Sequence, residues 1–307
     1  MKKPVIFGLK SLELNQEEIN FFKKVMPVGF ILFARNIKDK KQVKNLTDSL
    51  KEICGENIFI LIDQEGGRVQ RMTEPNWKKY PSGEYFANLY LEDPDLARKK
   101  CYENFTELTN DLKEVGINTN CTPILDINFK DTHEIIKSRA FGTNPEKIAD
   151  LGKVIAKTHL DNGLFPIIKH IPGHGRSLAD SHLELPVIDV SLEELQKTDF
   201  IPFKELSDIK FAMTAHILYS QIDDQNPATM SKKMIDIIRN DIGFKNIIMT
   251  DDLSMKALQG SFTEKTEKSL IAGCDLILHC NGDIKEMIEI NNSLDYIGDE
   301  LLIKLMN

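Results

Sequence analysis

Residues 169–186, KHIPGHGRSLADSHLELP, concentrate side chains whose types are suited to acid/base or metal chemistry. Asp180 and His182 lie two residues apart, so an extended backbone places both side chains on the same side. An aspartate that accepts a hydrogen bond from one ring nitrogen fixes the imidazole tautomer and leaves the other nitrogen for proton transfer. Because the ordinary pKa of histidine is about 6.5, this pair is suited to general acid/base catalysis near neutral pH.

Short apolar runs are expected to form the strands that position these groups. They are rich in β-branched residues and nearly continuous in hydrophobicity, which is typical of strands buried on both faces. The eight runs cover residues 4–9, 29–34, 58–63, 120–128, 165–171, 211–217, 246–253 and 274–280. Helical patterns lie between them, with capping-box spacing at Asn15 and Glu18. The alternation predicts an α/β fold, a single (β/α)8 TIM barrel that forms one domain over residues 1–307. An open doubly wound sheet competes, but it usually carries a glycine-rich phosphate turn after an early strand.

Polar residues follow the ends of consecutive predicted strands, where the active sites of such barrels are built. These residues are Asp63, Arg139, Lys169, His170, His216 and Asp251. Asp251 at the end of a buried strand is a candidate nucleophile, and Asp252 is expected to cap a following helix. Arg71, Arg139 and Lys169 are candidates to bind a neutral, hydroxyl-rich substrate and to favour ionised carboxylates.

Each of these residues also has an ordinary structural explanation. Asp63 could cap a turn, and Arg71 could be a solvated surface charge. Lys169 and His170 are adjacent, so their side chains leave a strand on opposite sides unless a bulge redirects one of them. His159, near the end of a helix, is expected to place a favourable charge against the helix dipole. Their joint occurrence on one barrel face favours a functional site.

Zinc binding is the alternative chemistry for the same residue types. Side chains that suit zinc in type are those of Asp63, His170, His174, His182, His216 and Asp251. The sequence contains no H-x-H pair, which metallohydrolases with this fold usually carry. His170 and His174 have a helical spacing, but Pro172 and Gly173 oppose a helix there. The pattern favours acid/base chemistry without a metal, and a metal-dependent amidohydrolase remains the alternative.

Composition narrows the class of protein. A net charge of −8 and an isoelectric point of about 5.5 argue against a broad nucleic-acid or anionic-membrane footprint. The sequence has no run long enough for a signal-peptide core or a transmembrane helix. Five scattered cysteines without C-x-x-C spacing are typical of reduced thiols. We expect a cytoplasmic protein with no nucleic-acid or membrane partner.

Six ordered motifs together resemble glycoside hydrolase family 3, in its bacterial β-N-acetylglucosaminidase branch. They are DQEGGRVQR, SRAFG, KHIPGHGRSLADSHLELP, MTAHI, PATMS and MTDDLSMKA, and the resemblance runs over about residues 29–280. The resemblance implies a cytoplasmic enzyme that removes terminal β-linked N-acetylglucosamine with retention of configuration. The usual substrate in this branch is a peptidoglycan fragment, N-acetylglucosamine joined to 1,6-anhydro-N-acetylmuramic acid, with or without peptide.

The resemblance also assigns roles by position. Asp251 would be the nucleophile, and His182, assisted by Asp180, would be the acid/base. The residues that would hold the sugar are Asp63, Arg71, Arg139, Lys169 and His170. A histidine acid departs from the usual glycosidase pair of carboxylates. No metal or organic cofactor is implied, and we expect a monomer. A phosphorylase on the same fold and a non-catalytic sugar-binding barrel remain alternatives.

Overall fold

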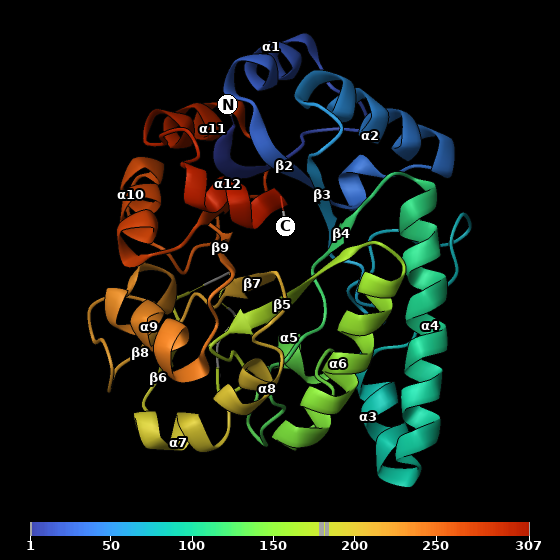
Figure 1. Cartoon of the computed structure of the whole chain (residues 1–307), viewed down its shortest axis with the longest axis vertical. Coiled ribbons are helices and arrows are strands. Elements are labelled where there is room, and N and C mark those ends of the chain that lie inside the picture. Colours follow the sequence, from blue (N-terminus) through green and yellow to red (C-terminus); the bar gives the residue numbers. More distant parts are fainter. Residues whose placement is uncertain (1, 178–180, 182–183, 307) are drawn as a thin grey trace.

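The computed structural model describes residues 2–177, 181 and 184–306. In this part of the chain, eight parallel strands close into a barrel, in agreement with the predicted fold (Figure 1). Around the barrel the strands are β1 (Lys3–Gly8), β2 (Pro27–Leu32), β3 (Phe59–Ile62), β4 (Thr119–Asn120), β5 (Phe165–Ile171), β7 (Phe211–Thr214), β9 (Ile247–Asp252) and β10 (Leu276–His279). Outside the barrel, β6 (Val187–Ile188) pairs with β8 (Leu218–Tyr219).

Helices surround the barrel (Figure 1). They are α1 (Gln16–Val25), α2 (Lys40–Cys54), α3 (Gly83–Glu92), α4 (Pro94–Glu114), α5 (Glu134–Lys137), α6 (Pro145–Asp161), α7 (Leu192–Lys197), α8 (Phe200–Glu205), α9 (Lys232–Ile237), α10 (Phe262–Ala272), α11 (Ile284–Asn292) and α12 (Asp299–Met306). The predicted capping box at the start of α1 is confirmed. The Asn15 side chain accepts from the Glu18 backbone, and the Glu18 carboxylate accepts from the Asn15 backbone.

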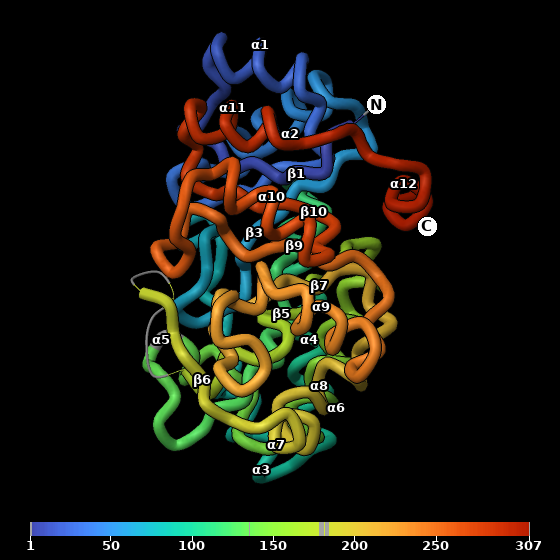
Figure 2. The backbone as a smooth tube through the Cα atoms, turned by 90° about the vertical axis from the view of Figure 1, so that its left-hand side faces the viewer, coloured from blue at the N-terminus to red at the C-terminus, as the bar shows by residue number. Residues whose placement is uncertain are grey.

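The barrel interior is a packed apolar core. Its inward side chains come from seven of the strands and from Cys121, which follows β4; the strand residues include Ile6, Ile31, Leu61, Ile167, Met213, Met249 and Leu278. At the end where the strands begin, Phe59, Phe165 and Phe211 meet edge to face. Residues of α12 pack against this core, and Figure 2 shows that helix on the opposite side of the molecule from β6. Cavities lie at both ends of this core, one between α12 and the beginnings of the strands and one at the carboxyl ends, where the predicted polar residues gather.

Two predictions of local structure were wrong. The fourth strand was expected over residues 120–128, but β4 ends at Asn120; beyond it the segment keeps separate backbone hydrogen bonds to β5 and an isolated bridge between Ile124 and Lys169. Pro123 has no backbone N–H to donate to a ladder, which is why regular pairing stops there. Asp252 does not cap a helix: its carboxylate accepts from the Ser254 backbone, and the next helix, α10, has Ser261 as its N-cap.

Candidate active site

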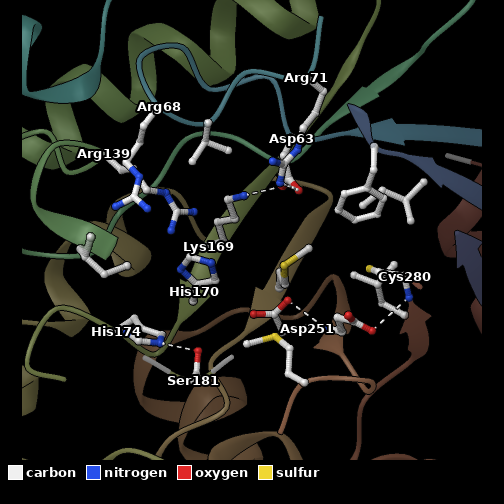
Figure 3. Close-up of a pocket in the computed structure, with 18 residues that line it drawn as sticks. Asp63, Arg68, Arg71, Arg139, Lys169, His170, His174, Ser181, Asp251 and Cys280 are labelled. Atoms are coloured by element: carbon white, nitrogen blue, oxygen red, sulfur yellow. Dashed lines mark hydrogen bonds and ion pairs between the residues drawn. The ribbon is translucent and has the colours of Figure 1, made fainter. Parts of the chain in front are cut away.

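A cavity of about 260 Å³ opens at the carboxyl ends of the strands (Figure 3). Side chains from β2, β5, β7, β9 and β10 and from the segments after β3 line it. Its apolar floor is the top of the barrel core, where Ile31, Met213 and Leu278 lie. The structure brings these sequence-predicted residues together around the cavity: Asp63, Arg71, Arg139, Lys169, His170 and Asp251.

A buried ion network centred on Lys169 forms one wall. The ammonium group lies 2.8 Å from a carboxylate oxygen of Asp63 and 2.8 Å from one of Glu65, and only 2% of the Lys169 side chain is exposed. Arg139 donates two hydrogen bonds of 2.8 Å to Glu65, and Arg71 lies 3.1 Å from Asp63. Three cations therefore alternate with two carboxylates, so every charge of the set has a partner of opposite sign.

Electrostatics keep these groups ionised. Burial raises the pKa of Asp63, but the charges of Lys169 and Arg71 outweigh burial and hold that pKa well below its usual range. The pKa of Glu65 is lowered in the same way, against burial, by Arg139 and Lys169. Burial disfavours the charged form of Lys169, yet the two carboxylates raise its pKa overall. Asp63, Glu65 and Lys169 are therefore already charged at neutral pH, and none of them has to gain or lose a proton when a substrate binds.

Lys169 and His170 both line the cavity, although they are adjacent in β5. The register between β5 and β7 shifts between Lys169 and Ile171, so the regular alternation of side chains is interrupted at this point of β5. The His170 Nδ1 atom lies 2.6 Å from Asp126, a fully buried carboxylate. Burial would raise the pKa of Asp126, but His170 beside it lowers the value to about 2. This contact fixes the orientation of the His170 ring.

Asp251 extends from the end of β9 into the cavity, opposite the ion network (Figure 3). One of its carboxylate oxygens accepts a 2.8 Å hydrogen bond from the backbone of Asp252. Behind them, His216 donates from Nε2 to the Asp252 carbonyl at 3.0 Å, and its Nδ1 atom accepts from Thr229 at 2.7 Å. His216 is fully buried, and burial lowers its pKa. It supports the backbone next to Asp251 and does not line the cavity.

The predicted acid/base pair, Asp180 and His182, lies outside the described residues. Ser181 between them is described, and its hydroxyl lies 3.1 Å from the Nε2 atom of His174. In the described part of the chain, no group of three or more histidine, cysteine, aspartate or glutamate side chains is placed to hold a metal ion.

The expectation for His159 was wrong. Its ring is fully buried in the barrel wall, where Nδ1 donates to the Ile155 carbonyl at 2.8 Å and Nε2 accepts from Asn120 at 3.1 Å. Burial lowers its pKa to about 4, so the ring is neutral at neutral pH. The helical position was right, but the side chain faces the core and carries no charge for the dipole.

Sequence reasoning missed several residues of the site. Glu65 stands inside DQEGGRVQR, so its motif was a usable signal, whereas Asp126 sits in an apolar run where only its contacts reveal its role. Arg68 is exposed at the rim and donates to the Glu134 carbonyl. Phe33 also lines the cavity, and the Arg71 guanidinium lies 5.3 Å from its ring centroid.

Comparison with known proteins identifies the family. Residues 5–301 match the family model described as the glycosyl hydrolase family 3 N terminal domain. The chain belongs to glycoside hydrolase family 3. Curated relatives in this family include the β-hexosaminidases of Actinobacillus pleuropneumoniae serotype 3 and Methylobacillus flagellatus. The first is 34% identical and covers 95% of this chain and 85% of its own length; the second is 34% identical with 91% and 80% covered.

Comparison with solved structures also finds a similar protein, NagZ. NagZ from Neisseria gonorrhoeae, in complex with N-trifluoroacetyl-D-glucosamine, superposes with a TM-score of 0.92 at 32% identity. The match covers 99% of this chain and 89% of that one. This member of family 3 is therefore a glycoside hydrolase of the β-N-acetylhexosaminidase type, with a carbohydrate substrate. None of the helices among the described residues has the length and apolar character needed to cross a membrane.

Proposed function

We propose that the chain is a retaining, exo-acting β-N-acetylglucosaminidase whose site lies within one domain. The observation that carries the proposal is the cavity itself, in which the Asp251 carboxylate faces the charged wall formed by Asp63, Lys169 and Arg71. Pockets for drug-sized ligands measure roughly 300–1,000 Å³. A cavity of about 260 Å³ is suited to one terminal sugar, which supports exo action.

The proposed mechanism has two steps. Asp251 attacks the anomeric carbon and forms a covalent glycosyl-enzyme, while His182, oriented by Asp180, protonates the glycosidic oxygen. The same histidine then takes a proton from water, which attacks the anomeric carbon and releases the sugar from Asp251. The residues assigned to hold the sugar are Asp63, Arg71, Arg139, Lys169 and His170. Because the charged residues among them are already paired with one another or with Glu65, they orient the ring without reorganisation during the reaction.

The proposed substrate is a peptidoglycan fragment, N-acetylglucosamine β-linked to 1,6-anhydro-N-acetylmuramic acid, with or without peptide. The resemblance of the six motifs supports this choice, and so does the N-acylated glucosamine bound by the similar gonococcal NagZ. We further propose that the enzyme is a cytoplasmic monomer, that it needs no metal or organic cofactor, and that it has no nucleic-acid or membrane partner.

A hydrolysis assay tests the proposal. Wild type, Asp251→Ala and His182→Ala are compared on 4-nitrophenyl N-acetyl-β-D-glucosaminide, with and without EDTA and phosphate. We expect turnover that is indifferent to both additions, abolished by Asp251→Ala and strongly reduced by His182→Ala. Loss of activity in EDTA would favour a metal-dependent hydrolase, and a rate that depends on phosphate would favour a phosphorylase. Binding without turnover would favour a non-catalytic barrel.

A further inference from the structure

Ser181 joins the two sides of the cavity mouth. Its hydroxyl lies 3.1 Å from the Nε2 atom of His174, which follows β5, and Figure 3 shows this contact. Its carbonyl accepts a 3.2 Å hydrogen bond from the backbone of Ala257, in the segment that follows Asp251. Ser181 itself is buried, with 4% of its surface exposed. A residue held from both sides in this way has a defined position.

His174 is in turn fixed by Asp126. The His174 backbone N–H donates to one oxygen of this buried carboxylate at 2.6 Å, and the other oxygen lies 2.6 Å from the Nδ1 atom of His170. The turn that brings His174 to this place depends on Gly175, because a Cβ atom there would stand 1.9 Å from the Ile127 carbonyl oxygen. One carboxylate thus aligns a sugar-binding histidine and the histidine that contacts Ser181.

Burial favours the neutral form of the His174 ring. Burial, with a smaller effect from the nearby His170, lowers its pKa to about 4, so the ring is neutral at neutral pH. Its Nδ1 atom is buried and has no hydrogen-bond partner among the described residues. Because Nε2 is the ring nitrogen that has a partner, we assign the proton to Nε2, which then donates to Ser181. The His174 ring therefore contacts Ser181 as a neutral hydrogen-bonding group.

We propose that His174 and Ser181 are positioning residues for the acid/base step. Ser181 stands between Asp180 and His182 in the sequence, and its own contacts to His174 and Ala257 are the route by which it would act on that step. This inference rests on the proposed function, which assigns the acid/base role to His182. A misplacement of about 1 Å at a catalytic group can cost roughly 100-fold in rate. Loss of this single hydrogen bond is therefore expected to act on catalysis and not on sugar binding.

The test uses two substrates that differ in their need for an acid. The leaving group of 4-nitrophenyl N-acetyl-β-D-glucosaminide needs little protonation, whereas the N-acetylglucosamine–anhydro-N-acetylmuramic acid disaccharide needs a full proton. We expect Ser181→Ala and His174→Phe to lower kcat/KM on the disaccharide by about 10- to 100-fold and on the nitrophenyl substrate by less than about 5-fold. KM should stay close to that of wild type. Ser181→Thr, which keeps the hydroxyl, should restore activity, and Ser49→Ala on the exposed face of α2 is the matched control.

Double variants identify the route of the effect. If Ser181 and His174 act through one bond, the double variant should be no worse than either single variant. In a His182→Ala background, Ser181→Ala should cause no further loss on the disaccharide. Selective loss with His182→Ala but equal or no loss with Ser181→Ala would overturn this inference and leave the proposed function intact. If His182→Ala itself changes neither substrate, the proposed function fails. Should His174→Phe fail to fold, as thermal denaturation would show, Ser181→Ala decides alone.

Discussion

Replacement of Glu65 by glutamine tests the ion network most directly. Glu65 accepts two hydrogen bonds of 2.8 Å from Arg139 and lies 2.8 Å from the Lys169 ammonium, with 7% of its surface exposed. Glutamine has the same size and keeps one oxygen acceptor, but it removes the negative charge. The change removes the carboxylate to which Arg139 donates two hydrogen bonds, and it leaves Asp63 as the carboxylate that pairs with Lys169.

The magnitude follows from the burial of these groups. Removal of one partner of a buried ion pair costs roughly 3–5 kcal/mol, because the other charge stays buried without compensation. Glu65→Gln keeps an amide oxygen as acceptor, and Lys169 keeps its contact with Asp63. We therefore expect a loss of folding free energy at the lower end of this range, about 3 kcal/mol. At roughly 2 °C per kcal/mol for a chain of this size, the melting temperature should fall by about 6 °C. Since Lys169 and Arg139 are assigned to the sugar, KM should rise by about 10-fold, with a smaller change in kcat.

Thermal denaturation and steady-state kinetics on the nitrophenyl substrate measure both effects. Glu107→Gln is the matched control, because Glu107 forms an exposed ion pair with Lys78 on the molecular surface. Exposed pairs are worth about 0–1 kcal/mol, so this variant should melt and react like wild type. Equal melting temperatures and equal KM for the two variants would refute the argument that burial makes the Glu65 charge important.

Other variants test the remaining features of the structure. Asp251→Asn should lower kcat by at least about 10³-fold and leave the melting temperature unchanged within about 2 °C, since the amide oxygen can still accept from the neighbouring backbone. The folded-state pKa of His159 is depressed to about 4, so its stabilising contribution is fully present above about pH 6.5 and is lost as pH falls towards 4. Urea denaturation between pH 7 and pH 4 should show a slope of up to about 1.4 kcal/mol per pH unit from this group, and that part should vanish in His159→Gln. Gly175→Ala should destabilise by more than about 2 kcal/mol and reduce activity, because its Cβ would meet the Ile127 carbonyl, while Gly298→Ala, with open space around it, should be neutral.

The sequence predicted the barrel because a buried parallel strand leaves a simple signature. Seven of the eight runs overlap a barrel strand over at least four residues, and the signature depends only on local composition. β4 is the exception, since the run around Pro123 continues to be apolar after its pairing has ended. An apolar run indicates that a segment is buried, but strand pairing also requires backbone N–H donors. A proline lacks this donor, so a buried apolar segment that contains one need not form a regular strand.

The site was predictable in part for a related reason. Position at a strand end was enough to gather Asp63, Lys169 and Asp251, because the fold carries those ends to one place. Partners were not predictable, because Glu65 and Asp126 become recognisable only through the cations and rings that they contact. For His159, the sequence predicted the position on α6 correctly. It did not predict that the side chain points into the core, because this direction depends on tertiary packing.

Burial of the charges in the ion network costs desolvation free energy, so the network is not the most stable way to fill this part of the protein. Buried ion pairs can often be replaced by apolar residues of similar volume with a neutral or stabilising effect of about 1–4 kcal/mol, because desolvation of the charges is expensive. Joint replacement of Glu65 and Arg139 by Met should therefore preserve or raise the melting temperature, whereas Glu65→Gln lowers it. Both changes should weaken binding of the sugar. A double variant with a higher melting temperature and a higher KM than wild type would show that the charges are retained for the substrate; a melting temperature below that of Glu65→Gln would refute this view.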